Sequence, residues 1–444
     1  MAMKALDIYK LLPKTNCKRC GYPTCLAFAM KLAAGKAEVE ACPDLDPGTK
    51  ALLGGATRPP VRLVGVGVGE RSVAAGEEFV LFRHEKAFSH PPGIMVQVSD
   101  TWPEERVRSI VETVRETVVH RVGMDLVLTG VAVRNESRSP GRFAEAVALA
   151  GGGSTLPLVL IAGDLAAHEA ALAVAGHYRP LVHAATEENR EDLARLAKRY
   201  GCPLAVRAAS PAGLAALTAE CAAAGVVDLM LDPAPRSLQD YIAMASGIRK
   251  AAIGRTEPAL GYPIYFDTTP FRETDAALAA GILKYAGVIV VPPLPPATVA
   301  AALTLRQNIY TDPQKPIQVT PGLYPVNEPG RDAPVLLTVN FSLTYFTLLG
   351  YLEASRIPCY LLIVDTEGLS VLTAVAGGKL TETLVADSLR NFGVGETVDH
   401  RLLVIPGYAA PLSGKIEDAT GWKVMVGPRD AAELAGYLEK EWRA

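Results

Sequence analysis

The sequence predicts an α/β protein in three parts: a small cysteine-rich N-terminal domain, a central (β/α)8 TIM barrel and a C-terminal doubly wound, Rossmann-like domain. Three observations predict this fold class. Four of the seven cysteines lie within the first 42 residues. Apolar runs of strand length then alternate eight times with segments of helical period, as in a closed barrel. The same alternation begins again in the last stretch of about 115 residues.

Length and composition are those of a globular α/β protein. The 444 residues are about three times the usual domain length of roughly 150. A net charge of -3 without long runs of one sign argues against a nucleic-acid partner. The uncharged stretches 146–163 and 286–305 contain glycines or prolines that interrupt a helix. Since the N-terminus also lacks a signal-peptide core, we expect a cytoplasmic protein and no membrane partner.

The N-terminal cysteines Cys17, Cys20, Cys25 and Cys42 have the spacing C-x2-C-x4-C-x16-C. An odd cysteine total suits a reduced compartment and a bound metal better than disulfides. Three thiols crowded into nine residues, with a remote fourth followed by proline, are typical of an iron–sulfur cluster. Zinc is the alternative, although structural zinc usually takes two separated C-x2-C pairs. Unligated core cysteines are the third interpretation.

Local signals place one of these cysteines at the start of a helix. Thr24 is a good N-cap, and we expect a helix from Cys25 that ends at Gly35. Free N–H groups and the helix dipole favour an anionic sulfur in that first turn. The domain, residues 1–57, ends in a Gly- and Pro-rich hinge over 54–60, so we expect a mobile electron-transfer module. Cys202, Cys221 and Cys359 are flanked by apolar residues and are expected to be buried and unreactive.

Residues 58–92 are expected to form a linker and a β-hairpin, because the stretches from Val61 and from Glu77 alternate like two strands. The barrel is expected over residues 93–325. Its strands should begin near Ile94, Leu126, Leu156, Arg179, Pro203, Val226, Pro263 and Gly287. Four acidic residues lie at strand ends, where such barrels carry out chemistry: Asp100, Asp164, Asp232 and Asp267. Capping of the following helices is the other interpretation.

Residues 326–444 are expected to form four parallel strands with helices on both faces. The strand ends carry Asn340, Asp365, Gly407 and Gly427. Ligands of such domains bind outside the carboxyl ends of the strands. A ligand site is therefore predicted there.

Several motifs in order along the whole chain resemble the large (gamma) subunit of corrinoid iron–sulfur proteins, found also as the gamma subunit of acetyl-CoA decarbonylase/synthase complexes. They are LDIYKLLPKTNCKRCGYPTCLAFAMKLAAGKAEVEACP, RQNIYTDPQKPIQV, NFSLTYF, DTEGLSVLTA, IEDATGW and VGPRDA. The resemblance implies a [4Fe-4S] domain, a TIM barrel and a corrinoid-binding domain. It also implies a heterodimer with a smaller (delta) barrel subunit.

The implied function is methyl carriage in the acetyl-CoA (Wood–Ljungdahl) pathway. In that family a Co(I) corrinoid accepts methyl from a methyltetrahydrofolate-type or methyltetrahydromethanopterin-type donor through a methyltransferase. It then passes the methyl group to acetyl-CoA synthase/CO dehydrogenase, and the [4Fe-4S] cluster reduces accidental Co(II). Such a methyltransferase component is inactive without partner enzymes. The motif D-x-H-x-x-G is absent from the sequence, so a cobalamin-type corrinoid is expected base-off and without a histidine ligand.

Carried over by motif, the cluster ligands are the four N-terminal cysteines, and Thr373 is expected to face the cobalt. The implied corrinoid contacts are Asn340, Phe346, Ser370, Val371, Leu372, Thr373 and Ala432. The alternative interpretation of SVLTA, residues 370–374, is that it only begins a helix and contacts no cofactor. Two other functions remain open: an Fe–S electron-transfer protein with a different C-terminal cofactor, and an interaction scaffold with a zinc-bound N-terminus.

Overall fold

The computed structural model describes residues 5–33, 37–50, 53, 59–69, 71–152, 156–312 and 316–443. The chain forms two compact units, Met1–Val119 with Leu126–Tyr310, and His120–Asp125 with Thr311–Ala444. The expected helix end at Gly35 and most of the expected hinge lie outside the described residues. Among the described residues, no helix has the length and hydrophobicity that a membrane span requires.

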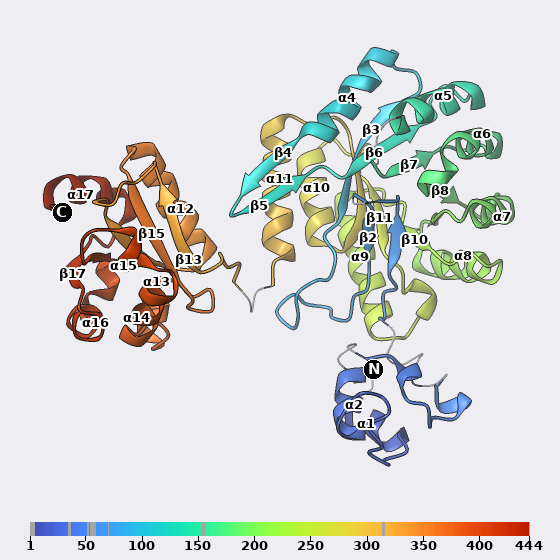
Figure 1. Ribbon diagram of the computed structural model, residues 1–444. Helices are drawn as coiled ribbons and strands as arrows, with labels where there is room; N and C mark the ends of the chain where they lie inside the picture. The colour runs from blue at the N-terminus through green and yellow to red at the C-terminus, as the bar shows by residue number, and fades with distance from the viewer. Residues whose placement is uncertain are drawn as a thin grey trace. The chain divides into compact units, whose positions relative to one another are not determined.

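The N-terminal segment packs two helices, α1 (Ala5–Leu11) and α2 (Cys25–Ala33), around a small core of its own (Figure 1). The helix predicted from Cys25 is confirmed at its start. Thr24 caps it, because its Oγ1 accepts a hydrogen bond from the Ala27 N–H at 3.0 Å. The apolar residues Phe28 and Leu32 of α2 are almost fully buried in this core.

The central part is a closed barrel of eight parallel strands, in the order in which they follow along the chain (Figure 1). The strands are β3 (Gly93–Ser99), β6 (Gly130–Arg134), β7 (Leu158–Ile161), β8 (Leu181–Ala185), β9 (Leu204–Arg207), β10 (Leu229–Asp232), β11 (Ile264–Asp267) and β12 (Ala286–Val291). The surrounding helices are α4 (Glu104–Glu116), α5 (Pro140–Gly151), α6 (Leu165–Ala175), α7 (Arg190–Tyr200), α8 (Pro211–Ala223), α9 (Leu238–Ile253), α10 (Thr274–Leu283) and α11 (Pro296–Tyr310). Nearly every strand residue is buried, since helices cover one face and the barrel interior the other. The predicted barrel is confirmed.

Two details of the prediction are wrong. The apolar run from Leu126 is not one strand, because β5 (Met124–Val127) pairs with β4 (Val118–Arg121) and only β6 enters the barrel. Gly130 is the first residue of β6 and allows a close approach to the neighbouring segment, since a Cβ there would lie 2.2 Å from the Pro157 carbonyl oxygen.

The expected hairpin also forms differently. Its strands β1 (Val64–Val66) and β2 (Val73–Ala75) both lie before Glu77, and the segment from Glu77 adds only an isolated antiparallel bridge between Glu78 and Val61. The Glu78 side chain also anchors this segment, because its carboxylate accepts from the Ser89 N–H at 2.8 Å and pairs with Arg249 of α9 at 2.9 Å. One backbone bridge and these side-chain contacts therefore hold the segment, without the ladder of a longer strand.

The C-terminal unit contains a five-stranded sheet in the order β13-β15-β14-β16-β17. Its four parallel strands lie where they were predicted: β14 (Val335–Val339), β15 (Cys359–Val364), β16 (Leu402–Ile405) and β17 (Lys423–Val426). The antiparallel edge strand β13 (Gly322–Val326) was not predicted. It contains Pro325, which a sheet tolerates at an edge because no neighbour needs its missing N–H.

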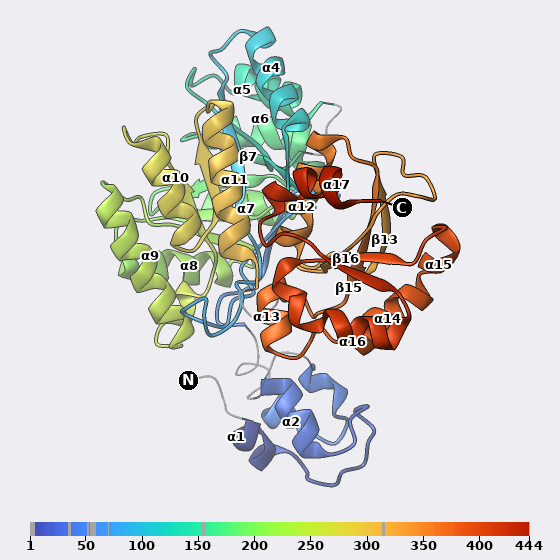
Figure 2. The ribbon, with the colours of Figure 1, turned by 90° about the vertical axis from the view of Figure 1, so that its left-hand side faces the viewer.

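Helices cover both faces of this sheet (Figure 2). On one face, α12 (Ser342–Ser355) and α17 (Leu434–Glu441) pack against Leu336, Leu361 and Val404. The other face holds α13 (Val371–Ala376), α14 (Glu382–Asn391), α15 (Val394–Thr397) and α16 (Ser413–Thr420). Each parallel strand therefore ends at the same edge of a sheet that is covered on both sides.

Candidate functional site

The four N-terminal cysteines are all free thiols, and polar contacts link the chain segments that carry Cys17, Cys25 and Cys42. Cys25 is tied to the loop before Cys17, because its N–H donates to Asn16 Oδ1 at 2.8 Å and its sulfur lies 3.4 Å from the Asn16 nitrogen. The Cys17 sulfur lies 3.6 Å from Asp44 Oδ2, two residues after Cys42. The structure thus brings the loop of Cys17, the start of α2 and the Cys42 turn together.

Exposure differs within this set. Cys17 is exposed and Cys20 half-buried, whereas Cys25 and Cys42 are buried in the core of the segment. The backbone N–H and then the side chain of Arg19 lower the pKa of Cys17, and Arg19 is itself paired with Asp44. In the described part of the chain, no three His, Cys, Asp or Glu side chains lie close enough to form a finished metal site. The donor set nonetheless fits a soft metal or an iron–sulfur cluster, because all four donors are thiols.

A cavity of about 510 Å³ lies in the C-terminal unit at the carboxyl ends of β14, β16 and β17. Strands β14 and β16 are neighbours at the point where the strand order reverses. From β14 the chain continues to β15 on one side, and then to β16 on the other side. Its walls come from the strand ends, the start of α12, the start of α13 and the loop 427–431. The predicted ligand position at these strand ends therefore holds a cavity.

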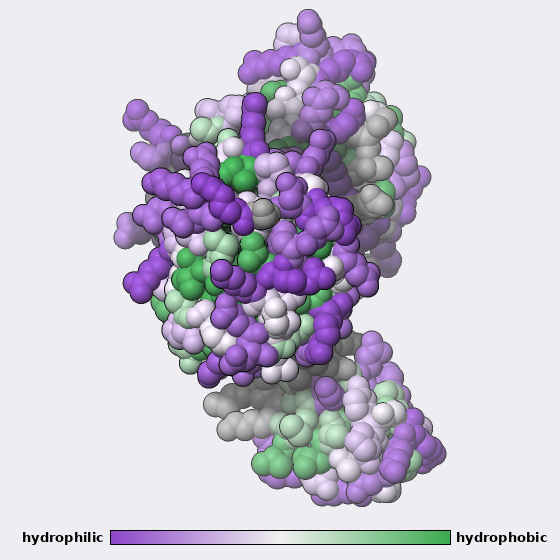
Figure 3. All heavy atoms as spheres, turned by 60° about the vertical axis from the view of Figure 1, so that its left-hand side comes forward, coloured by the Kyte–Doolittle hydropathy of each residue, from purple (hydrophilic) through white to green (hydrophobic). Residues whose placement is uncertain are grey.

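Large apolar side chains surround this cavity. Leu343, Leu372 and Tyr408 line it and are 53%, 57% and 42% exposed. In Figure 3, which brings the C-terminal unit forward, hydrophobic residues form patches among the polar ones. Exposed apolar groups around a cavity are typical of a binding site for a large, partly apolar ligand.

Of the seven expected corrinoid contacts, Ser370, Val371 and Leu372 line the cavity. Ser370 is the N-cap of α13: its Oγ accepts from the Thr373 N–H at 3.4 Å, and the two hydroxyls lie 3.0 Å apart. The segment SVLTA thus does begin a helix, and its first three residues also line the cavity. Leu372 faces outward from its first turn.

The remaining expected contacts lie near the cavity without lining it. Phe346 is on α12 with its ring centre 4.9 Å from that of Tyr345. The Ala432 N–H donates to Asp430 Oδ1 at 3.0 Å, and Asp430 does line the cavity. Thr373 is exposed one residue beyond Leu372.

Asn340 is only 1% exposed, and its amide makes five hydrogen bonds. Its Oδ1 accepts from the N–H groups of Thr366 and Gly368, both at 3.0 Å, and from the Thr366 hydroxyl at 3.2 Å. Its Nδ2 donates to Asp365 Oδ1 at 2.9 Å. Asn340 therefore fixes the turn that leads into Ser370, a role that the sequence pattern did not reveal.

The strand-end aspartates of the barrel do not cap the following helices. Asp100 accepts from the N–H groups of Glu136 and Ser137, both at 2.9 Å, in the neighbouring loop. Asp164 occupies an N-cap position without a side-chain hydrogen bond to the helix. Asp232 and Asp267 accept from residues two positions later, Ala234 and Thr269. The capping interpretation is wrong for these four.

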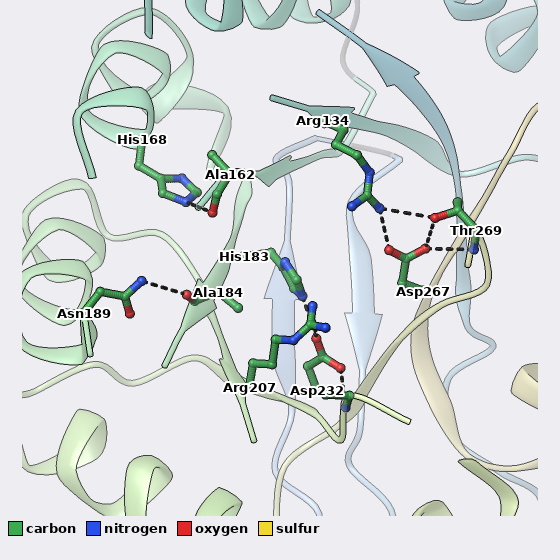
Figure 4. A network of polar contacts seen from close by, with 11 residues as sticks. Arg134, Ala162, His168, His183, Ala184, Asn189, Arg207, Asp232, Asp267 and Thr269 are labelled. Atoms are coloured by element: carbon green, nitrogen blue, oxygen red, sulfur yellow. Dashed lines mark hydrogen bonds and ion pairs between the residues drawn. The ribbon is translucent and has the colours of Figure 1, made fainter. Parts of the chain in front are cut away.

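Two of these aspartates belong to a polar network at the carboxyl end of the barrel (Figure 4). Asp232 Oδ2 lies 2.7 Å from His183 Nε2 and 3.5 Å from Arg207 Nη1. Asp267 pairs with Arg134. The sequence pattern did not single out His183, because its partner is 49 residues away. The one available signal was the alternation of side chains along each strand, which predicts that His183 and Asp232 point into the barrel.

The three isolated cysteines are buried, as predicted. Burial raises the pKa of Cys202 and Cys221 to about 11 and that of Cys359 to about 12. Thiols of this kind are protonated at neutral pH and unreactive.

Comparison with known proteins adds the family. The family model "CO dehydrogenase/acetyl-CoA synthase delta subunit" matches residues 63–438, and the model "Putative Fe-S cluster" matches residues 12–43. The acetyl-CoA decarbonylase/synthase complex subunit gamma of Methanopyrus kandleri is 41% identical over 99% of this chain and 98% of its own. The corrinoid/iron-sulfur protein large subunit of Moorella thermoacetica is 40% identical over 98% of both chains. The chain therefore belongs to the family of these corrinoid/iron–sulfur protein large subunits and acetyl-CoA decarbonylase/synthase gamma subunits.

Proposed function

We propose that this protein is a methyl-group carrier of the acetyl-CoA pathway, built as a corrinoid-dependent methyltransferase component. The observation that carries the proposal is the cavity at the strand ends of the C-terminal unit, with exposed Leu343, Leu372 and Tyr408 around it. A bound corrinoid supplies the cobalt that takes up and releases the methyl group. The unit would then be a Rossmann-like, corrinoid-binding domain over residues 326–444.

The chain's own residues orient this cofactor and exclude water. Asn340 holds the turn before α13, so that Val371 and Leu372 present an apolar wall next to the Ser370 hydroxyl. Thr373, at the exposed first turn of α13, is the group that we place opposite the cobalt. Lack of a D-x-H-x-x-G histidine favours a base-off corrinoid with no protein ligand below the metal.

Cys17, Cys20, Cys25 and Cys42 would hold a [4Fe-4S] cluster in the N-terminal domain, residues 1–57. When bound, the cluster supplies the electron that restores an oxidised corrinoid. Support comes from the all-thiol donor set and from the positively charged Arg19 beside Cys17, which stabilises anionic sulfur. The segment 58–92 and the barrel, residues 93–325, would connect the two cofactor domains.

The partners follow from this role. We place the chain in a cytoplasmic heterodimer with a smaller barrel subunit, which would cover the apolar rim of the cavity. A methyltransferase acting on a tetrahydrofolate- or tetrahydromethanopterin-type donor would load it, and acetyl-CoA synthase/CO dehydrogenase would unload it.

Anaerobic metal analysis with a visible spectrum tests the proposal, using the chain coexpressed with its small-subunit partner and supplied with corrinoid. We expect about four iron atoms per chain and one cobalt, with corrinoid bands that shift on reduction and on addition of methyl donor. Iron without cobalt would overturn methyl carriage and leave an electron-transfer protein. Zinc in place of iron would overturn the cluster as well.

A further inference from the structure

The carboxyl end of the barrel carries a cluster of charged and polar side chains that methyl carriage does not use. Neighbouring strands contribute them in sequence order: Gln97 from β3, Arg134 from β6, His183 from β8, Arg207 from β9, Asp232 from β10 and Asp267 from β11. Figure 4 shows the Arg134, His183 and Arg207 side chains converging from different strands. This is the end at which (β/α)8 barrels bind their ligands.

The anionic members of the cluster already have partners. Arg134 pairs with Asp267 and donates from Nε to Gln97 Oε1 at 2.8 Å. Asp232, whose side chain is 5% exposed, is shared between His183 at 2.7 Å and the Ala234 N–H at 2.8 Å. Neither carboxylate is left to receive a cationic ligand.

Arg207 differs from its neighbours. Its guanidinium lies 3.5 Å from Asp232, beyond a good hydrogen bond, and its side chain is 47% exposed. A guanidinium carries five N–H donors in a planar fork that matches a carboxylate or a phosphate. Arg207 thus lies half-exposed at the end of β9 and is only loosely paired, which leaves N–H donors for a ligand.

Tyr265 lies beneath this group. Its ring centre is 4.4 Å from that of His183, the residue is fully buried, and its hydroxyl has no hydrogen-bond partner among the described residues. Tyr265 precedes Asp267 by two residues on β11, so both side chains point to the same face of that strand. A buried hydroxyl without a hydrogen-bond partner is rare in proteins, and it indicates that a ligand or water supplies the missing acceptor.

We propose that the barrel mouth binds a small molecule through an oxyanion, a carboxylate or a phosphate group, with Arg207 as the principal contact and the Tyr265 hydroxyl as a donor from below. Arg134 and His183 frame the anion while staying paired with Asp267 and Asp232. The proposal does not depend on the corrinoid, because all these residues belong to the barrel.

Titration calorimetry on the full chain, at low ionic strength and under anaerobic conditions, tests this site. The probes are inorganic phosphate and acetate, with chloride as the control anion. Wild-type protein should bind phosphate or acetate but not chloride, and the preferred probe identifies the oxyanion. In Arg207→Gln the affinity should fall at least about tenfold, the loss expected for a charge-assisted bidentate contact. Tyr265→Phe should weaken binding less.

The matched control is Arg195→Gln on α7, whose side chain is 75% exposed and paired only with its own helix neighbour Asp192. It should bind like wild type. If Arg207→Gln does not fold, Arg207→Lys keeps the charge without the fork and should still weaken binding. Absence of binding for both probes, or equal affinity in wild type and the Arg207 variants, would overturn the proposal and leave the cluster as a set of mutually neutralising charges.

Discussion

Asn340 Oδ1 accepts a hydrogen bond from the Gly368 N–H at 3.0 Å and so joins the end of β14 to the turn before α13, 28 residues later. Gly368 has φ +75°, and a Cβ there would lie 2.8 Å from Gln318 Cγ. The turn therefore needs both a glycine and the buried amide. This pair sets the position of Ser370 and of the cavity wall that follows it.

Replacing that amide should loosen the turn. Asn340→Ala leaves several buried donors without an acceptor, so we expect a loss of about 2 to 3 kcal/mol in the free energy of unfolding. Hydrogen exchange of residues 365–376 should accelerate, and cobalt occupancy should fall. The exposed Asn391→Ala is the control. Unchanged exchange in Asn340→Ala would contradict the role.

The cluster assignment predicts a difference among cysteines. Serine at Cys17, Cys20, Cys25 or Cys42 should lower the iron content and bleach the cluster absorption, because each thiolate is a ligand. Cys221→Ala removes a buried thiol of raised pKa and should leave iron unchanged. Iron per chain measured after anaerobic purification decides this, and equal iron in both kinds of variant would refute the ligand set.

The edge of the cavity should tolerate substitution without unfolding. Leu372 is 57% exposed, so Leu372→Arg places a charge where an apolar ligand packs and costs little stability. We expect lower cobalt content at unchanged iron, and the same for Thr373→Trp. Val227→Arg, at an 81% exposed position of the barrel, is the control. Normal cobalt occupancy in Thr373→Trp would contradict the placement of Thr373 opposite the cobalt.

Arg249 and Glu78 form a buried ion pair at 2.9 Å, with side chains 5% and 8% exposed. Arg249→Met leaves the buried Glu78 carboxylate without its partner, so we expect the free energy of unfolding to fall by about 3 to 5 kcal/mol, measured by denaturant unfolding. The double variant with Glu78→Gln should recover part of it. By contrast, breaking the exposed pair of Arg195 and Asp192 should change stability by less than about 1 kcal/mol. A small effect of Arg249→Met would show that water reaches the pair.

His168 predicts a pH dependence of stability. Burial lowers its pKa to about 4, and its Nε2 lies 3.1 Å from the Ala162 carbonyl oxygen. The unfolded chain takes up a proton near its ordinary pKa of about 6.5 while the folded chain does not, so stability falls as the pH drops below that value. Between pH 7.5 and pH 5 we expect this group to contribute a loss of about 2 kcal/mol.

Urea unfolding at pH 7.5 and pH 5 measures this loss in the free energy of unfolding. His168→Leu should remove about that part of the pH dependence, whereas His120→Gln, at a side chain 79% exposed, should not. Equal pH dependence in wild type and His168→Leu would show that another group is responsible.

Hydrophobic periodicity alone was enough to predict the barrel and the four parallel strands of the C-terminal unit. Strands such as β12, buried along its whole length, leave a continuous apolar run that no surface segment would carry. The spacing of the four cysteines likewise predicted an iron–sulfur segment where the model "Putative Fe-S cluster" matches residues 12–43. These features are local, because each depends on residues near one another in the chain.

Other features depend on contacts that no local pattern contains. The run from Leu126 is split because β5 pairs with β4 and only β6 joins the barrel, and β13 forms because β15 offers it an edge. His183 meets Asp232, and Asn340 meets Gly368, only after the strands that carry them are side by side. The sequence by itself determined most strands and helices of the barrel and of the C-terminal unit. Tertiary structure decided which polar groups share a site, because a buried polar group takes its partners from whatever residues the fold brings near.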